Sequence, residues 1–398
     1  MNISTISVPQ QTELQDGFSA AFYDKVEDLF SDIPLGWSAP DLFLQQPYLT
    51  ALEENPPLGM KFLFILFRKN TRVVGLAACQ ILHFKGGKSL HFPQKTSCFV
   101  TALGNYLKKS VANKVEFDTL ICGSLLLTGE HGFWVENMER EAAHALMEAA
   151  LTQAQNHLNE QGTKVTATVV KDYYTPSESL VSNGFVEYVI QPNMLMKLSQ
   201  NWKKQEDYLS DLQSKYRIRA KRAFKRLEPI EKRVLSATNL AQEAARIYEL
   251  YQNIASEAGF NTIQLHPNYL VELKKYLPEA YQVVGYYLDN QLIAFYSTIK
   301  NGDELEAHFL GYDKTLNPEK QIYLNMLFDI IATGIEQQAS SIVFARTASE
   351  IKSSVGAVAH EMFCYLRHHK PLTNRLLGTI FDYLNPEEEW LPRHPFKS

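Results

Sequence analysis

The chain has 398 residues, of which 45% are apolar and 21% charged, and its formal net charge is −5 at pH 7. These fractions are those of ordinary globular proteins, which excludes a disordered, collagen-like or coiled-coil chain. The length exceeds one ordinary domain and favours two. The acidic balance excludes attraction to nucleic acid by overall charge, so any anion site must come from a local patch.

The cysteines and the N-terminal residues indicate in which cellular compartment the protein is expected. Cys79, Cys98, Cys122 and Cys364 lie too far apart for a zinc or redox motif, and four cysteines form no disulfide framework at this length. Residues 1–5 contain neither a basic start nor an apolar run, and the longest apolar stretch is far shorter than the ~20 residues of a membrane span. We therefore expect a soluble, cytoplasmic protein with free thiols, no membrane span and no metal site.

The first half of the chain contains alternating strand and helix signals. Residues 1–60 are expected to be a polar, irregular entry that ends at the breaker cluster 55–59. Apolar runs and helical periodicity then predict one hairpin, three further strands and one helix. In chain order these are a hairpin over 61–84, a strand over Asp118–Leu127, a helix over Asn137–Leu158, and strands over Thr163–Val170 and Phe185–Leu198.

The second half repeats this order. It contains a hairpin over Tyr281–Ile299, a strand over Leu305–Tyr312, a helix over Glu319–Gln337, a strand over Ser341–Ala345, a short helix after Ala348, and a strand over Met362–Leu366. Strands mixed with helices predict an α/β fold with a mixed sheet of the α+β kind. The repetition predicts two domains related by duplication, 1–200 and 201–398. The alternative is two unrelated halves that share only a coarse order.

This order of elements resembles the GNAT acyltransferase fold, in which a central strand, the following helix and the next strand hold acyl-CoA. The junction of the halves is more specific: Asn183-Gly184-Phe185 and later Ser214-Lys215-Tyr216-Arg217 precede a basic helix. That stretch, together with Arg346–Lys352 running into Gly356, is similar to FemABX-type and related tandem-GNAT proteins. The resemblance implies two GNAT-like domains and acyl-CoA as a possible co-substrate, with no cofactor bound permanently.

The sequence departs from the GNAT pattern at the glycine-rich loop that holds the pyrophosphate of CoA. After the first central strand it has Thr128–Gly132, whose two glycines could present backbone N–H groups to an anion. After the second it has Asp313–Pro318, which contains no glycine. The acyl donor is therefore left open between acyl-CoA and an aminoacyl-tRNA, which FemABX enzymes use.

A dense basic segment begins the second half. Its seven cations lie within twelve residues: Lys215, Arg217, Arg219, Lys221, Arg222, Lys225 and Arg226. At helical spacing Tyr216, Ala220, Ala223 and Leu227 form a narrow apolar stripe that can dock on a domain. The exposed cations predict a phosphate or carboxylate partner such as CoA, tRNA or an anionic polymer, with Arg219, Arg222 and Arg226 in contact with it. The alternative is a solvated interdomain helix.

The strand 305–312 contains three polar side chains. Strict alternation places Leu305, Ala307 and Phe309 on one face and Glu306, His308 and Tyr312 on the other. A transfer to an amine needs a base and donors for the developing oxyanion. We therefore predict Glu306, His308 and Tyr312 as catalytic, with Glu306 or His308 as the base. The alternative is a structural histidine beside a glutamate.

The segment after the strand 341–345 is the other candidate region. Charged and hydroxyl side chains follow the carboxyl end of that strand, where α/β folds commonly bind ligands. We predict that Arg346, Ser349 and Lys352 bind substrate or cofactor. The alternative is a helix start capped by Thr347 or Ser349.

These observations predict an acyltransferase that moves an acyl or aminoacyl group from acyl-CoA or aminoacyl-tRNA to an amine, with its active cleft in the second half. Its partners would be a small-molecule acyl donor, an amine acceptor and possibly tRNA. The alternative is a non-catalytic GNAT-like module that binds an anionic small molecule or a glycan. The sequence gives neither the acceptor nor the oligomeric state, and it leaves open whether the chain is an enzyme.

Overall fold

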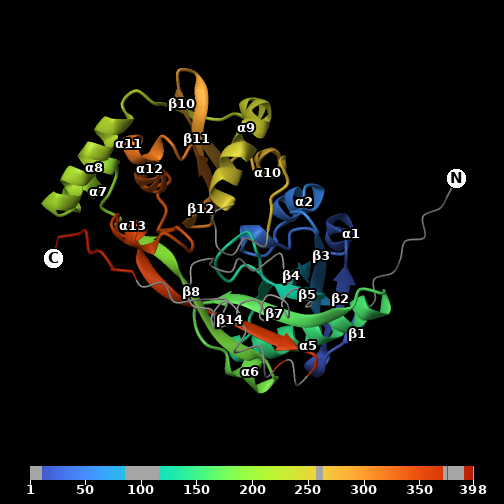
Figure 1. Ribbon diagram of the computed structural model, residues 1–398. Helices are drawn as coiled ribbons and strands as arrows, with labels where there is room; N and C mark the ends of the chain where they lie inside the picture. The colour runs from blue at the N-terminus through green and yellow to red at the C-terminus, as the bar shows by residue number, and fades with distance from the viewer. Residues whose placement is uncertain (1–10, 86–115, 257–262, 371–373, 375–389, 398) are drawn as a thin grey trace, which may run out of the picture. The chain divides into compact units, whose positions relative to one another are not determined.

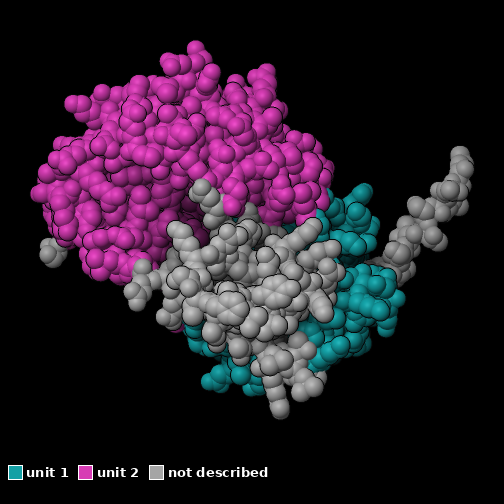
Figure 2. Space-filling model, viewed as in Figure 1, with its two compact units in different colours: residues 1–53, 59–189, 363–384 teal, residues 54–58, 190–362, 385–398 magenta. Residues whose placement is uncertain are grey.

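The strands of the computed structural model belong to two units, which are coloured separately in Figure 2. The structure describes residues 11–85, 116–256, 263–370, 374 and 390–397, so Cys98 and residues 1–5 lie outside the described part. Unit 1 consists of 1–53, 59–189 and 363–384, and unit 2 of 54–58, 190–362 and 385–398. The sequence predicts domains 1–200 and 201–398. In the structure, the long segment of unit 1 ends at residue 189 rather than 200, and unit 1 also contains residues 363–384.

The sheet of unit 1 has the strand order β1-β2-β3-β4-β5-β7-β14. All neighbours are antiparallel except β5 and β7, which are parallel. The short strand β6 pairs with β4 beside this path. The strands are β1 Gln11–Glu13, β2 Phe18–Tyr23, β3 Met60–Lys69, β4 Arg72–Lys85, β5 Glu116–Cys122, β6 Phe133–Val135, β7 Val165–Tyr173 and β14 Val358–His368.

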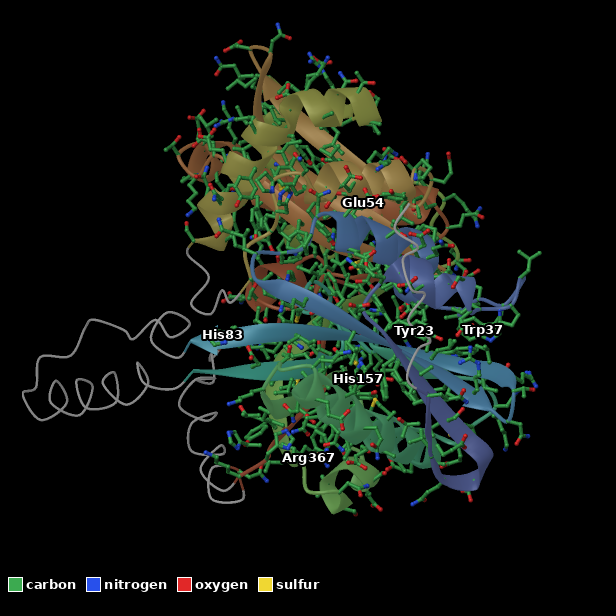
Figure 3. All side chains as sticks on the ribbon, turned by 90° about the vertical axis from the view of Figure 1, so that its right-hand side faces the viewer. Tyr23, Trp37, Glu54, His83, His157 and Arg367 are labelled. Carbon is green, nitrogen blue, oxygen red and sulfur yellow. The ribbon has the colours of Figure 1, made fainter. Side chains whose placement is uncertain are left out.

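The long helix α5 covers one face of this sheet. Its apolar stripe, which includes Met147 and Leu151, packs in one core cluster with side chains of β2 to β5, β7 and β14. Arg367 of β14, labelled in Figure 3, donates from Nη1 to Glu148 of α5 at 2.6 Å. The helices of unit 1 are η1 Gln15–Gly17, α1 Val26–Ser31, η2 Leu42–Leu44, α2 Gln46–Glu54, α5 Arg140–Glu160 and α6 Glu178–Ser182.

The sheet of unit 2 has the order β8-β13-β12-β11-β10-β9. Again one pair, β12 and β13, is parallel and the others are antiparallel. The strands are β8 Val186–Lys197, β9 Glu231–Val234, β10 Tyr281–Leu288, β11 Gln291–Asn301, β12 Glu304–Tyr312 and β13 Ser341–Val343.

Helices cover both faces of the unit 2 sheet. In Figure 1, α9 and α10 lie on one side of β10 to β12, and α12 with α8 on the other. On the second side a core cluster contains side chains such as Met194, Leu305 and Ile331. The helices are α7 Gln205–Asp211, α8 Ser214–Leu227, α9 Ala237–Ala255, α10 Tyr269–Tyr276, α11 Asn317–Lys320, α12 Ile322–Glu336 and α13 Ser349–Ser353. None of the described helices is long and apolar enough to cross a membrane.

The two units repeat one order of elements, which confirms the predicted duplication and mixed α/β class. In each, a strand and two helices precede an antiparallel hairpin and a third strand. A helix then crosses to a parallel strand, and a short helix follows. The corresponding elements are β3 and β10, β4 and β11, β5 and β12, α5 and α12, β7 and β13, and α6 and α13.

The last strand of each repeat completes the sheet of the other unit. β8 follows α6 in the chain, but its Leu195 and Met196 pair with Val343 and Ile342 of β13. β14 follows α13, and its Phe363 pairs with Tyr173 of β7. Dividing the chain at its midpoint therefore does not divide the strands between the two units.

Several expected boundaries differ from the structure. The segment 11–60 is not irregular: it contains β2, whose six residues are all buried, and the helices α1 and α2. The strand expected over Asp118–Leu127 ends at Cys122, because Gly123 has a positive φ of 130°. The helix expected over Glu319–Gln337 is divided into α11 and α12 at Gln321, whose φ is 51°.

Candidate active site

β12 pairs with β13 only over its first three residues, which face the whole of the short strand β13. Their parallel register runs from Glu304 opposite Ser341 to Glu306 opposite Val343. Beyond this point the chain of β13 stays with β8, because Phe344 N–H donates to Met194 O and Met194 N–H donates to Ala345 O. β12 continues to Tyr312. Within the described chain, the edge of β12 beyond Glu306 therefore lacks a strand neighbour on that side.

A β-bulge interrupts β12 immediately after this point. Tyr296 pairs with Leu310 and Thr298 with Ala307, so β12 has one residue more than β11 between these pairs. The hydroxyl of Ser297, which is 1% exposed, fixes the bulge. It accepts a hydrogen bond from Phe309 N–H and donates one to Phe309 O, each at 3.0 Å.

The bulge corrects the expected alternation of side chains. Leu305 and Ala307 pack in the core beside α12, so Glu306 and His308 face α9 and α10. Phe309, expected opposite His308, also faces this side, where its ring contacts Tyr251 and Tyr269. Tyr312, expected beside Glu306 and His308, packs on Tyr323 of α12 instead. The reason is the inserted residue, since one additional residue reverses every later side chain.

His308 is held as a neutral imidazole. Its Nε2 lies 3.1 Å from the hydroxyl of Tyr269 on α10, and its Nδ1 is buried with no hydrogen-bond partner among the described residues. Burial lowers the pKa of His308 to about 3. An imidazole with this pKa is a poor proton acceptor from an ammonium group, so His308 fits a hydrogen-bonding role better than that of the base.

Glu306 lies at the point where the two strands separate. It pairs across the sheet with Ile299 of β11 on one side and Val343 of β13 on the other, and it is 3% exposed. Residues paired across a sheet share a face, so all three point toward α9 and α10. The carboxyl group of Glu306 therefore shares a face with His308.

The loop after β13 has a constrained backbone. Ala345, Thr347 and Ala348 have positive φ values of 57°, 65° and 52°, which non-glycine residues adopt at a cost in free energy. The loop leads into α13, whose N-cap residue is Ala348 and which has no side-chain cap hydrogen bond. The capping explanation of Thr347 and Ser349 therefore fails. Arg346 and Ser349 are partly buried in this segment.

Lys352 of α13 points back to the end of β13. Its Nζ donates to Arg346 O at 2.6 Å and to Ala345 O at 3.2 Å, and the residue is 5% exposed. Burial lowers the pKa of Lys352 to about 7. A lysine with this pKa is not a permanent cation at neutral pH.

The basic helix α8 docks as its sequence predicts. Its buried residues are Tyr216, Ala220, Ala223 and Leu227. Asn325, near the start of α12, donates from Nδ2 to Ala223 O at 3.0 Å and so ties the two helices together. None of the seven cations of α8 forms an ion pair with a carboxylate within the described ranges, and Arg219, Arg222 and Arg226 are exposed.

One row of basic side chains on α8 lies near α13 at one end and near α11 at the other. Lys215, Arg219, Arg222 and Arg226 are spaced by four, three and four residues, which places them in one row. Arg219 donates to Ser354 Oγ, directly after α13, at 2.9 Å. At the other end, the charge of Arg226 contributes to a lowered pKa of Glu319 in α11, whose main cause is the hydrogen bond with Lys320.

The structure thus brings together part of the predicted set. Glu306 and His308 share a face of β12, Arg346, Ser349 and Lys352 follow β13, and Arg219 contacts the end of α13. Tyr312 faces α12. Sequence reasoning missed Tyr269 and Ser297, for which an apolar helix and strand give no local signal.

The corresponding place in unit 1 is filled. β5 and β7 pair in parallel as far as Cys122 opposite Val170. Lys171, 7% exposed, donates from Nζ to Ser124 O at 2.6 Å and to Leu127 O at 3.1 Å, and it forms an ion pair with Asp172. A Cβ at Gly123 would lie 2.4 Å from Lys171 Cγ, so only glycine fits there.

The glycine-containing loop of unit 1 does not open a helix. β6 follows Thr128–Gly132, and α5 begins only at Arg140. The side chain of Glu130 accepts from Tyr174 N–H at 2.9 Å, and His131 Nδ1 lies 3.1 Å from Asp41 Oδ2. The loop therefore does not directly precede a helix, which agrees with the plain-loop alternative and removes the helix N-terminus from the anion-binding one.

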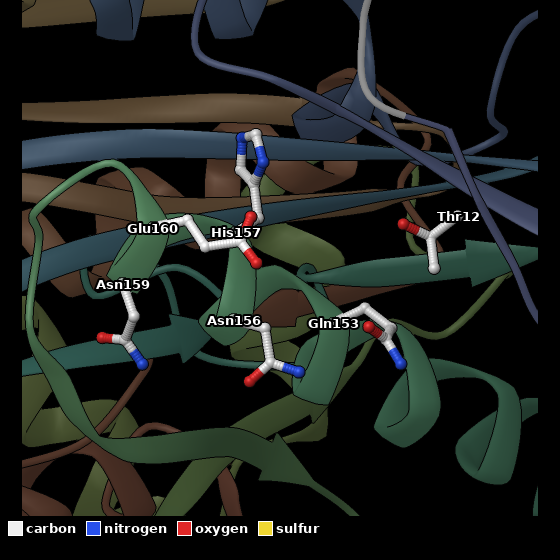
Figure 4. A pocket seen from close by; sticks show the side chains of 6 residues that line it. All are labelled: Thr12, Gln153, Asn156, His157, Asn159 and Glu160. Carbon is white, nitrogen blue, oxygen red and sulfur yellow. The ribbon is translucent and has the colours of Figure 1, made fainter.

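A separate pocket of about 330 Å³ lies in unit 1 (Figure 4). It contains none of the predicted site residues. Its lining is polar and comes from β1 and the C-terminal turns of α5: Thr12, Gln153, Asn156, His157, Asn159 and Glu160.

Comparison with known proteins identifies only structural likenesses. No family model matches the sequence, and no curated protein does. The chain is similar to the crystal structure of FemX, with 12% identity, 84% of this chain and 97% of that chain covered, and a TM-score of 0.49.

Two further solved structures are similar. One is a tandem GNAT protein from the clavulanic acid biosynthesis pathway, with 10% identity, 88% and 99% coverage and a TM-score of 0.49. The other is L-PGS from Bacillus licheniformis, with 11% identity, 85% and 96% coverage and a TM-score of 0.45. Each unit repeats the order of elements that the sequence resemblance to the GNAT fold implied. At these TM-scores no argument rests on the neighbours.

Proposed function

We propose that unit 2 transfers an acyl or aminoacyl group to an amine. The separation of β12 from β13 after Glu306 and Val343 is the observation that carries this proposal. An unpaired strand edge can bind an extended amide-containing chain, such as the arm of CoA, through backbone hydrogen bonds. Backbone N–H groups at that edge can also stabilise the oxyanion that forms when an acyl carbonyl is attacked.

The side chains beside this edge fit the acceptor. The carboxyl group of Glu306 can hold the ammonium form of an amine and is a candidate for its proton. Neutral His308, placed by Tyr269, can hydrogen-bond to the acceptor or to the acyl oxygen through Nδ1. We do not place Tyr312 at the reacting atoms, because its ring faces α12.

The cations around the edge fit a phosphate-bearing donor. Arg219, Arg222 and Arg226 would bind its phosphates, with Arg346 and Ser349 closer to β13. Guanidinium groups bind phosphate in a bidentate manner. Among the described residues, no carboxylate forms an ion pair with an arginine of α8. Acyl-CoA and aminoacyl-tRNA both satisfy this requirement.

A second candidate function has one observation in its favour. The loop 313–321, where a GNAT fold would hold pyrophosphate, contains no glycine and begins with Asp313. A non-catalytic unit that binds an anionic small molecule or a glycan would need no such loop.

The test combines ligand stabilisation with turnover. We would measure the melting temperature with acetyl-CoA, longer acyl-CoAs and aminoacyl-tRNA, and then release of free thiol or tRNA with a panel of amines. A ligand at 100-fold its Kd stabilises by ~2.7 kcal/mol, which shifts the midpoint by several degrees. If none of these donors shifts the midpoint or is consumed, the transferase proposal is overturned.

The Glu306→Gln variant sharpens this test. Loss of the carboxylate is expected to lower turnover by ~10²–10⁴, the usual range for a group that handles a proton. Glu304→Gln is the matched control, since Glu304 lies on the same strand but is exposed. Equal turnover of the two variants would remove Glu306 from the site.

A further inference from the structure

The amine of Lys352 has an unusual set of partners for a buried lysine. Its Nζ donates to two backbone carbonyls, Ala345 O and Arg346 O, and within the described chain it contacts no carboxylate. An ammonium group has three N–H donors, whereas a neutral amine has two and a lone pair. The two carbonyls accept both N–H groups of the neutral amine, and its lone pair then points at neither carbonyl.

No charged neighbour explains the weak basicity of this amine. Glu350 of α13 is engaged by Arg393, and Arg219 of α8 donates to Ser354. Arg346 is on the adjoining loop and Glu306 on β12. Burial is the cause of the lowered pKa of Lys352, and none of these groups contributes.

Lys171 of unit 1 shows what a buried lysine looks like when it is structural. It is buried to a similar degree, but its Nζ has three oxygen acceptors, Ser124 O, Leu127 O and the Asp172 carboxylate. Three acceptors, one of them anionic, match a charged ammonium group. The neutral form therefore fits Lys352 and does not fit Lys171.

Lys352 is also placed where the reaction would occur. The pairing of β12 with β13 ends at Val343, and Ala345 lies two residues further along the chain, at most ~7 Å away. The carbonyl of Ala345 accepts a hydrogen bond from Lys352 Nζ, so this amine lies near the end of β13, after which the two strands separate. We propose that Lys352 is the general base of the acyl transfer, an inference that rests on the proposed function of unit 2.

The proton and electron pairs balance in this step. The Lys352 amine takes a proton from the acceptor ammonium, which Glu306 holds by its charge. The freed nitrogen lone pair forms the C–N bond, the C–S bond of the thioester breaks, and its electron pair leaves on sulfur. Lys352 releases this first proton to solvent, takes the second proton from the nitrogen that has attacked the carbonyl carbon, and passes it to the thiolate, so that a neutral amide and a thiol are formed. For an aminoacyl ester, the C–O bond breaks in the same way, and no oxidant or reductant is required.

The charge state of Lys352 can be tested without any substrate. We would label the full chain with a pulse of isotopic acetic anhydride across a pH series and quantify each lysine by mass spectrometry. The labelling of Lys352 is expected to have its midpoint near pH 7, whereas an unperturbed lysine in a peptide titrates near ~10.4. The exposed Lys203 is the internal comparison. A midpoint equal to that of Lys203, or no labelling of Lys352 at any pH that preserves the fold, would overturn the proposal.

Kinetics test the role itself. With an accepted acyl-CoA, kcat/KM of the wild type is expected to rise as the pH passes through about 7, because the base must be neutral. Lys352→Met should lower turnover by ~10²–10⁴ and abolish this limb of the profile. Lys352→Arg, which stays charged, should be equally slow, and Lys203→Met is the matched control.

The two tests separate the possible failures. If the wild type uses no donor, the proposed function fails, while the labelling still reports whether Lys352 is neutral. If the wild type is active and Lys352→Met keeps both its rate and its pH profile, the base assignment fails and the proposed function stands.

Discussion

The two repeats differ most at their single parallel strand pair. In unit 1, β5 and β7 stay paired to Cys122 and Val170, and the Lys171–Asp172 ion pair fills the space beyond. In unit 2, β12 leaves β13 after Glu306, and a bulge follows. The same order of elements therefore supports a closed copy and an open copy, and a few side chains decide which one forms.

The physical cost of each arrangement explains its local sequence. Closing unit 1 requires Gly123, because any Cβ there would collide with Lys171, and it requires a carboxylate for the buried ammonium. Opening unit 2 requires a partner for the backbone of the bulge, which Ser297 supplies. We infer that unit 1 is a scaffold and that unit 2 contains the site.

The largest expected effect tests the closed copy. Lys171→Met leaves the buried carboxylate of Asp172 without its ammonium, which should cost ~3–5 kcal/mol of unfolding free energy in urea titrations. Arg233→Met is the control, because it breaks the exposed pair with Glu231 and should cost less than ~1 kcal/mol. Equal losses in the two variants would show that the filled cleft of unit 1 contributes nothing particular to stability.

A smaller effect tests the open copy. Ser297→Ala removes both hydrogen bonds to Phe309 and leaves buried backbone groups unsatisfied, which should cost ~1–3 kcal/mol. Because the bulge sets the direction of His308, turnover should fall as well, and the Phe309 amide should exchange faster with solvent. Ser297→Thr keeps the hydroxyl and should preserve both. Normal turnover and slow amide exchange in Ser297→Ala would show that the bulge forms without this side chain.

The sequence predicted those features that depend on local pattern. Apolar runs located the hairpins 61–84 and 281–299, and the spacing of Tyr216, Ala220, Ala223 and Leu227 identified the docked face of α8. β2 was missed because it is buried on both faces and shows no alternation. The exchange of β8 and β14 also has no local signal, since each strand has an ordinary apolar pattern whichever sheet it joins.

The candidate site was predicted in part for a similar reason. Glu306 was found because it precedes the bulge, and His308 because it is the first of the two bulge residues and still follows the alternation. Tyr312 was misplaced because the bulge depends on Ser297, a residue of the neighbouring strand. The state of Lys352 depends on burial by α13 and on carbonyls at the end of β13, which no spacing in the sequence encodes.

The smallest expected effect on stability concerns the basic helix α8, which precedes β9 of unit 2. The Arg219→Ala, Arg222→Ala and Arg226→Ala triple variant should weaken binding of acyl-CoA and of short single-stranded RNA. If each arginine contacts one phosphate, the slope of log affinity against log salt for single-stranded RNA should fall in magnitude by ~2, because fewer counterions are released. These side chains are exposed, so the unfolding free energy should change by less than ~0.5 kcal/mol. A triple variant of exposed lysines in unit 1, Lys25→Ala, Lys61→Ala and Lys164→Ala, makes the same change in net charge. An equal loss of affinity and slope in both would mean that overall charge, and not the row on α8, attracts the anion.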